Sequence, residues 1–338
     1  MEHVIDIVLL SFLAVIALAI VRLRDLFAVV MLTGFYSLLS AALFVVLDAV
    51  DVAFTEAAVG AGIATILMLG TLGRIAGEPR EHRERPWLPM LVVLITGGAL
   101  LYGTLDMPHY GDPNAPVNLH VVPRYIEDSL AEIGVPNIVT SVLASYRGYD
   151  TLGETTVILT AAIGVMGLLQ GRRRKTPGSK APPASSNKRP RRASGVTGML
   201  GNTMQHHLIL HVIAKLLVPF ILLFALYVQF HGDFGPGGGF QAGVIFAAGF
   251  ILYGLIFGVN DAGLVASPAT VRLLIAAGLL LYAGVGVATM LLGGQFLDYS
   301  VLSTEPIKGQ HLGIMLIEFG VGTTVAATMV RLFYLFSR

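Results

Sequence analysis

The chain has 338 residues, of which 55% are hydrophobic and 13% are charged, and its mean hydropathy is +0.76. Soluble domains carry about 25% charged residues, so this chain has too few charges to cover a water-facing surface. Its 22 basic residues nearly balance its 21 acidic residues, which excludes a nucleic-acid binder with a strongly basic face. Because the sequence has no cysteine, disulfides, thiolate metal sites, iron–sulfur clusters and cysteine nucleophiles are also excluded. These features predict an integral membrane protein.

Nine apolar segments are long enough, or nearly long enough, to cross a bilayer as helices. A hydrocarbon core about 30 Å thick requires about 20 apolar residues in helical form, because lipid cannot hydrogen-bond the backbone. The expected spans are residues 4–21, 26–47, 52–73, 87–105, 152–171, 207–230, 240–258, 273–292 and 312–335. We therefore predict an all-α integral membrane protein with nine transmembrane helices.

The distribution of Lys and Arg predicts the orientation of these helices. With the N-terminus outside, the segments on the inside contain 18 of the 22 basic residues, the segments on the outside contain three, and one lies within a span. A shift by one helix would remove this separation. The positive-inside rule therefore predicts an N-terminus outside and a C-terminus inside.

Two irregular stretches divide the chain. Residues 172–204 are rich in Pro, Ser, Lys and Arg and have no apolar periodicity, which predicts a basic, disordered cytoplasmic linker. Residues 106–150 form an external loop, with a short interfacial helix expected over residues 137–146. The expected parts are a three-helix module, a two-helix module containing the external loop, the linker, and a four-helix domain. Their boundaries are 1–76, 77–171, 172–204 and 205–338.

Acidic residues in the third span are the first candidates for function, because a charge at the centre of a membrane helix costs about 2.5–3.5 kcal/mol and normally faces a bundle interior or a water-filled path. Glu56 lies more than one turn into this span, beyond Asp51. Gly60 shares the face of Glu56, so a partner helix or water can approach closely, and the small residues there permit a helix irregularity. Glu56 is predicted to accept a proton or to coordinate Na⁺ loosely. The alternative is a structural glutamate paired with a neighbouring subunit.

The further candidates for an ion or proton path are Glu154, Lys215, His211, His231 and Glu318. Glu154 begins the fifth span near the outer surface, where helix capping is an equally good explanation. Lys215 lies about nine residues into the sixth span, with His207 and His211 on the same face. Such a stripe can pass protons, although interfacial packing of the histidines is the alternative, and the spacing does not fit a zinc site. Glu318 lies in the last span.

The most distinctive string is HGDFGPGGGFQAG, residues 231–243, which we call the glycine loop. Its proline and three successive glycines permit positive φ angles and a tight return into the next helix. These four residues are Pro236, Gly237, Gly238 and Gly239. No Gly-Lys-Ser/Thr follows, so the string is not a phosphate loop. It is expected to line a hydrated pocket with His231 and Gln241 as polar walls; a plain hairpin is the alternative.

Taken together, these strings resemble parts of the Mrp-type (Mnh) multisubunit Na⁺/H⁺ antiporter. Residues 1–76, with DVAFTEAAVGAG, resemble the MbhD-like module near the end of the large A subunit. Residues 87–171, with SYRGYDTLGETTV, resemble the MbhE-like module that follows it. Residues 205–338, with the glycine loop, resemble the MnhB-type B subunit. In that family Glu56 matches an acidic position implicated in ion passage, and Glu154 matches the acidic residue of the DTLGE string.

The resemblance implies a subunit of a cation/H⁺ antiporter that contributes part of an intramembrane path for Na⁺ or H⁺. It implies a location in the prokaryotic plasma membrane, contact with lipid, no cofactor, no bound metal, no nucleic acid and no enzymatic chemistry of its own. The large antiporter-like domain of the A subunit has no counterpart here, so large antiporter-like partner subunits are expected. Two alternatives stay open: a membrane subunit of a redox-driven, hydrogenase-like or complex-I-like ion pump, and a non-conducting structural subunit.

Overall fold

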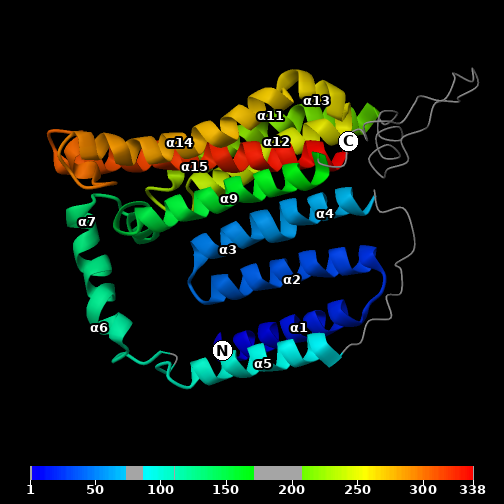
Figure 1. The fold of residues 1–338 in the computed structure, drawn as a ribbon, viewed down its shortest axis with the longest axis horizontal. Helices are drawn as coiled ribbons and strands as arrows, with labels where there is room; N and C mark the ends of the chain where they lie inside the picture. Colours follow the sequence, from blue (N-terminus) through cyan, green and yellow to red (C-terminus); the bar gives the residue numbers. More distant parts are fainter. Residues whose placement is uncertain (1, 74–86, 110, 171–207, 338) are drawn as a thin grey trace, which may run out of the picture.

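The computed structural model describes residues 2–73, 87–109, 111–170 and 208–337, and within these ranges it is helical and contains no strand (Figure 1). Nine of the described helices or continuous helix runs are long and apolar enough to cross a membrane, which confirms that prediction. They are α1 (Glu2–Arg22), α2 (Leu26–Val46), the run α3 (Val50–Glu56), η1 (Ala57–Ala64) and α4 (Thr65–Leu72), then α5 (Trp87–Thr104), α9 (Gly148–Gln170), α11 (Leu208–His231), α12 (Gly239–Phe257), α14 (Pro268–Leu291) and α15 (Pro306–Ser337). The predicted linker 172–204 lies outside the described residues.

The shorter elements lie between these spans. They are α6 (Pro116–Pro123), η2 (Arg124–Asp128), α7 (Ser129–Glu132), α8 (Ile138–Thr140), η3 (Ser141–Tyr146), α13 (Val259–Val265) and η5 (Tyr299–Leu302). A short helix is present over the expected residues 137–146, as α8 and η3. The helices α6, α7 and α13 were not predicted, because each is short and carries no long apolar run.

The core of the bundle lies around α15, which packs against α12, α14, α9 and α4. The backbones of α14 and α15 meet at two glycines: a Cβ on Gly320 would lie only 2.7 Å from the carbonyl oxygen of Gly278. Small residues of this kind let membrane helices approach closely. The fully buried Tyr282 joins α9 to this core, because its hydroxyl donates to the Gly148 carbonyl over 2.7 Å. Residues from distant parts of the chain thus form one bundle.

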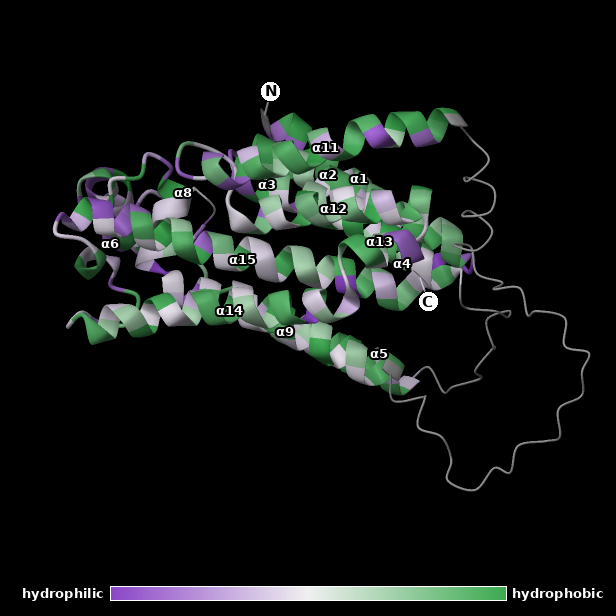
Figure 2. Cartoon of the chain, turned by 90° about the horizontal axis from the view of Figure 1, so that it is seen from above, coloured by the Kyte–Doolittle hydropathy of each residue, from purple (hydrophilic) through white to green (hydrophobic). Residues whose placement is uncertain are grey.

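The first helices pack on one side of this core. α12 contacts α3 and η1, while α2 lies against α3 and α1 against α2, which gives the stepped layer seen in Figure 1. By contrast, α5 has no buried residue. It overlaps α1 in Figure 1 but lies well away from it in Figure 2, and its large apolar side chains, such as Leu94, Leu100 and Leu101, are exposed. α5 is therefore open to lipid or to another protein.

The segment before α9 is folded outside the spans. It reaches from α5 to α9 through α6 and α7 (Figure 1), and α6 begins with Pro116, whose fixed φ suits a first helical position. The hydroxyl of Tyr146 donates to Glu132 over 2.5 Å, and Arg124 pairs with the same carboxylate at 3.2 Å. The Tyr146 hydrogen bond, followed by the Arg124 guanidinium, holds the pKa of Glu132 below its usual range. Burial raises the pKa of Tyr146 to about 12.

Three connections meet at one end of the bundle, which we call the loop end. Asn137, just before α8, donates to the carbonyl oxygens of Gly232 and Gly235 at 3.1 and 3.0 Å. Tyr299 of the α14–α15 connection donates to the Ala144 carbonyl over 3.0 Å. The hydrophilic residues gather at this end in Figure 2. The loop end therefore joins the segment before α9 to the C-terminal helices.

The last helix is longer than expected. α15 begins at Pro306 rather than at residue 312, because its first turns are polar and do not extend the apolar run. At 1.5 Å per residue its 32 residues span about 48 Å, well beyond a hydrocarbon core of about 30 Å. Its first turns therefore lie at the loop end, outside the most apolar part of the span.

Candidate functional site

A cavity of about 490 Å³ lies where α3, α9, α12 and α15 meet the glycine loop. Three acidic side chains line it: Asp51 from α3, Glu154 from α9 and Glu318 from α15. The other polar side chains in its wall are Thr55, Thr140, Thr151, Thr155 and Gln241. We call this the inner cavity. It places three of the acidic residues singled out in the sequence around one space.

The glycine loop forms one wall of the inner cavity. Gly237, Gly238 and Gly239 all line it. The backbone N–H of Gly237 donates to Asp51 Oδ1 over 3.3 Å. Gly238 has a φ of +103°, which only glycine adopts easily, and a Cβ there would lie 3.0 Å from Glu318 Oε1. The three glycines therefore bring bare backbone up to two of the carboxylates.

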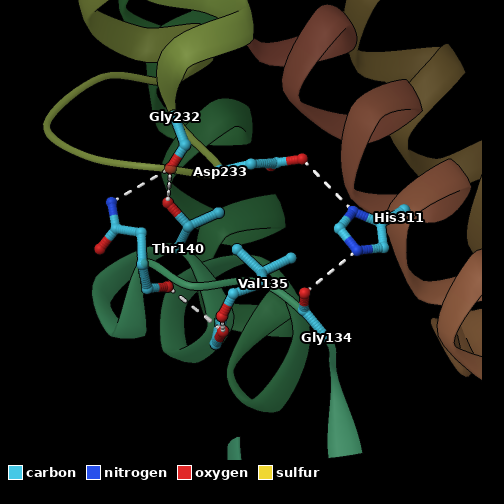
Figure 3. A network of polar contacts seen from close by, with 8 residues as sticks. Gly134, Val135, Thr140, Gly232, Asp233 and His311 are labelled. Carbon is cyan, nitrogen blue, oxygen red and sulfur yellow. Dashed lines mark hydrogen bonds and ion pairs between the residues drawn. The ribbon is translucent and has the colours of Figure 1, made fainter. Parts of the chain in front are cut away.

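Hydrogen bonds between helices hold this wall in place. Gln241, 7% exposed, donates from Nε2 to Thr55 Oγ1 over 2.9 Å and so ties α12 to α3. The hydroxyl of Thr140 donates to the carbonyl oxygen of Gly232 over 2.6 Å (Figure 3). Sequence reasoning missed Thr140 and Asn137. An N-cap signal was available for Asn137, whose Oδ1 accepts from the Val139 N–H, but nothing local indicates their contacts with the loop.

Glu318 differs from the other two carboxylates because it also lines a second cavity. Its side chain is half-buried, and it lines both the inner cavity and a second cavity of about 230 Å³ that also contains Asp233 and His311. Among the described residues the Glu318 carboxylate has no hydrogen-bond or ion-pair partner. It therefore lies between the two cavities, with its carboxylate available to each.

Glu56 lies on a different face of the third span and does not line the inner cavity. It is half-buried and is directed toward α2: a Cβ on Gly60 would lie 2.6 Å from Glu56 Oε1 and 2.7 Å from Ser37 Cβ. Within the described ranges its carboxylate has no hydrogen-bond partner. The helix becomes π-helical directly after it, over Ala57–Ala64. The irregularity that the small residues permit is thus present, and such turns often accompany functional sites.

We expect Gly60→Ala to weaken the packing of α2 on η1, because the added methyl group would collide with Ser37 and Glu56. Overpacking of this kind costs about 1–3 kcal/mol. The midpoint temperature of thermal unfolding of the purified protein should therefore fall. Gly62→Ala is the matched control in the same π-helical segment, since its Cβ would lie an ordinary 3.6 Å from the Ala57 carbonyl. Equal midpoints for the two variants would contradict this close approach.

The proposed stripe on α11 does not reach the inner cavity. The ring of His211 packs edge-on against Phe257 at 4.9 Å, and its Nε2 is buried without a hydrogen bond. Lys215 is exposed, because its neighbour Ala214 is the residue that α11 turns toward the bundle. His207 lies outside the described residues. The described part of the stripe is therefore not a continuous polar route.

His231 also differs from its expected role. Its ring stacks on Tyr227 with centroids 5.1 Å apart, and the two side chains approach to 3.4 Å between Nδ1 and the hydroxyl. It is not part of the inner cavity wall, so the expectation that it would line the pocket beside Gln241 is wrong. The ring also lies close to Gly235 of the glycine loop, where an added Cβ would be 2.9 Å from His231 Nε2.

Models of three protein families match separate parts of the chain. The domain related to the MnhB subunit of the Na⁺/H⁺ antiporter matches residues 209–331. The MbhD and MbhE families, the D and E subunits of MBH, match residues 11–76 and 104–188. An antiporter subunit named mnhB2 from Staphylococcus aureus (strain Newman) is 36% identical over 129 residues, which cover 37% of this chain and 91% of that protein. The chain belongs to the MnhB family.

Two longer proteins are similar to more of this MnhB-family chain. A protein of Rhizobium meliloti (strain 1021), named as the A/B subunit of a probable K⁺/H⁺ antiporter, is 28% identical over 240 residues, 67% of this chain and 23% of that protein. A chain in the structure of the Mrp complex from Dietzia sp. DQ12-45-1b superposes with a TM-score of 0.66 and 26% identity, covering 96% of this chain and 34% of that chain. The MnhB-family chain thus spans less than a quarter of the Rhizobium relative and about a third of the Dietzia chain.

The inner cavity lies where the three matched regions meet. Asp51 belongs to the region that matches MbhD, and Glu154 to the region that matches MbhE. Glu318 and the glycine loop belong to the MnhB match. Each region therefore contributes one carboxylate to the same space.

Proposed function

We propose that this protein is a subunit of a cation/H⁺ antiporter complex and that its inner cavity forms part of the ion or proton path. The observation that carries the proposal is the meeting of Asp51, Glu154 and Glu318 in one cavity. Carboxylates at membrane depth are costly, and they usually mark ion or proton routes. The antiporter names of the Staphylococcus and Rhizobium relatives support the same function.

The chemistry of the cavity suits competition between a proton and a monovalent cation. A carboxylate can hold either one, and hard cations such as Na⁺ prefer oxygen ligands. The threonine hydroxyls and the Gln241 carbonyl supply further oxygens in the wall. The transmembrane gradient drives such movement, since one charge crossing 100 mV is worth about 2.3 kcal/mol. The chain then acts within a transporter, without substrate chemistry of its own.

The chain is organised in this proposal as three joined parts. Residues 1–76 and 77–171 form the MbhD-like and MbhE-like modules, and residues 205–338 form the MnhB-like domain, with the basic linker 172–204 between them. The exposed apolar surface of α5 supports a position among other subunits, including large antiporter-like ones, with lipid covering what they leave open.

The proposed orientation places the loop end outside a prokaryotic plasma membrane. The N-terminus is then outside and the C-terminus inside. In this orientation the sequence segments predicted to lie inside contain 18 of the 22 basic residues, which supports the assignment. The bacterial sources of the similar proteins support the membrane.

The proposed function is tested by measuring cation-driven proton movement in everted vesicles that contain the whole complex. We expect Asp51→Asn and Glu56→Gln each to lower the exchange rate by about tenfold or more, because each removes a carboxylate able to carry a proton. Asp48→Asn is the matched control, since Asp48 is exposed in the turn before α3 and its positive φ suits asparagine.

The outcomes separate the possible roles of this chain. Full exchange by Glu56→Gln together with loss in Asp51→Asn would make Glu56 a structural residue and leave the path in the inner cavity. Full exchange by both variants in an intact complex would make the chain a non-conducting scaffold and overturn the proposal. Co-purification with an iron–sulfur or NiFe protein, in place of an antiporter-like one, would assign it to a redox-driven pump.

A further inference from the structure

A second group of titratable side chains lies at the loop end, beside the glycine loop (Figure 3). The cavity of about 230 Å³ that Glu318 shares is lined on its other side by Asp233 and His311. We call it the outer cavity. Asp233 comes from the glycine loop, and His311 comes from the second turn of α15. Among the residues that line the outer cavity, these three are the titratable groups.

Both ring nitrogens of His311 lie against oxygen atoms. Its Nδ1 lies 3.4 Å from Asp233 Oδ2, and its Nε2 lies 3.2 Å from the carbonyl oxygen of Gly134. A carbonyl oxygen and an ionised carboxylate only accept hydrogen bonds, whereas a neutral imidazole has a single N–H to donate. Both contacts are satisfied if the imidazole is doubly protonated, or if Asp233 is protonated and donates to Nδ1. Either way, the pair holds one proton more than a neutral imidazole beside a carboxylate.

The two acceptors are held by backbone contacts, so the arrangement is not easily relaxed. The Asp233 carbonyl oxygen accepts from the Asn137 N–H over 3.0 Å. Gly134 has a φ of +82°, and a Cβ there would collide with Ile307 and lie 3.3 Å from His311 Nε2. A glycine with this φ therefore brings its carbonyl oxygen directly against the imidazole.

This pair is connected to both water and the interior. The His311 and Asp233 side chains are 38% and 26% exposed, so protons can reach them from the loop end. Glu318 follows His311 by seven residues, and this spacing places both on one face of α15. Glu318 also lines the inner cavity. Water in the two cavities can then carry a proton from the His311–Asp233 pair to Glu318 and onward.

We propose that His311 and Asp233 form an outer proton-binding site that exchanges protons between the loop end and Glu318. The proposal rests on the proposed antiporter function and adds to it a defined outer end of the proton path. In the step itself, the shared proton leaves the pair for cavity water, and a proton on that water moves to the Glu318 carboxylate. The pair is recharged by a proton from the bulk phase, so charge and protons balance in each cycle.

The test measures cation-driven proton movement by the whole complex in vesicles across a range of pH. We expect His311→Gln to lower the rate by about tenfold or more and to change the pH profile of the rate, because it removes one of the two groups that hold the proton. Asp233→Asn should give the same profile, and the double variant should lose no more than either single variant, because the two residues act as one site. His120→Gln, an exposed histidine in α6, is the matched control.

A second measurement separates proton binding from a purely structural role. Infrared difference spectra of the purified complex, recorded on a step from pH 8 to pH 6, should lose the same imidazole–carboxylate signal in His311→Gln and in Asp233→Asn. Should His311→Gln fail to assemble, Asp233→Asn keeps the shape of the side chain and carries the test alone. An unchanged pH profile and spectrum in Asp233→Asn would overturn the outer site. If Asp51→Asn still lowered exchange by about tenfold or more, the proposed path would stand without the outer site; if both Asp51→Asn and Glu56→Gln kept full exchange, both proposals would fall.

Discussion

Replacing Glu318 with glutamine is expected to lower cation-driven proton movement by on the order of a hundredfold, the size of effect that loss of a positioned proton-transfer group usually has. Glu318 is the only described side chain that lines both the inner and the outer cavity. Glutamine keeps its shape but cannot take up a proton. The helix packing should therefore survive while the passage between the two cavities is lost.

Proton movement in vesicles, measured beside the amount of assembled complex, checks this expectation. Glu305→Gln is the matched control, because Glu305 is exposed just before α15 and pairs with Lys308 over 2.8 Å. Surface pairs of this kind contribute little to stability. A Glu318→Gln complex that assembles and exchanges at the normal rate would show that no essential proton passes this position.

Replacing Gly239 with alanine is expected to destabilise the C-terminal bundle by about 3 kcal/mol or more, at the upper end of overpacking effects. A Cβ at this position would collide with the carbonyl oxygen of Glu318 and lie 3.0 Å from the backbone nitrogen of Gly322. Both are backbone atoms of α15, so no side chain can move aside. The first turn of α12 would have to shift away from α15 and carry the glycine loop with it.

This loss of stability is measured by the midpoint temperature of thermal unfolding of the purified complex. The yield of complex from membranes is a second measure. Gly263→Ala is the control, since Gly263 lies in α13 and a methyl group added there would meet no atom within 4 Å. Exchange should fall together with stability in Gly239→Ala, because the same contact positions the Glu318 backbone. A midpoint equal to that of Gly263→Ala would contradict the close approach of α12 and α15.

The spans, the conspicuous residues and the family resemblance follow from the sequence alone. A membrane helix must satisfy its backbone internally over about 20 residues, so apolar length is enough to locate all nine spans. Acidic residues such as Glu154 and Glu318 interrupt those spans, and a charge within a membrane span costs free energy whichever way it points. Each can therefore be recognised from the sequence without knowing which residues lie beside it. The glycine loop is equally visible, because its run of glycines is unusual at any position.

Only the tertiary structure decides which of these residues meet. The helices are apolar around most of their circumference, so no polar stripe indicates which face turns inward. Asp51 and Thr55 reach the inner cavity, whereas Glu56, one residue later, turns toward α2 ahead of the π-helical segment. His311 and Asp233 lie in polar stretches that resemble ordinary loop ends, and their pairing depends on contacts between segments 78 residues apart. The thickness of the bilayer sets the length of each helix, but packing between distant helices decides in which direction each side chain points.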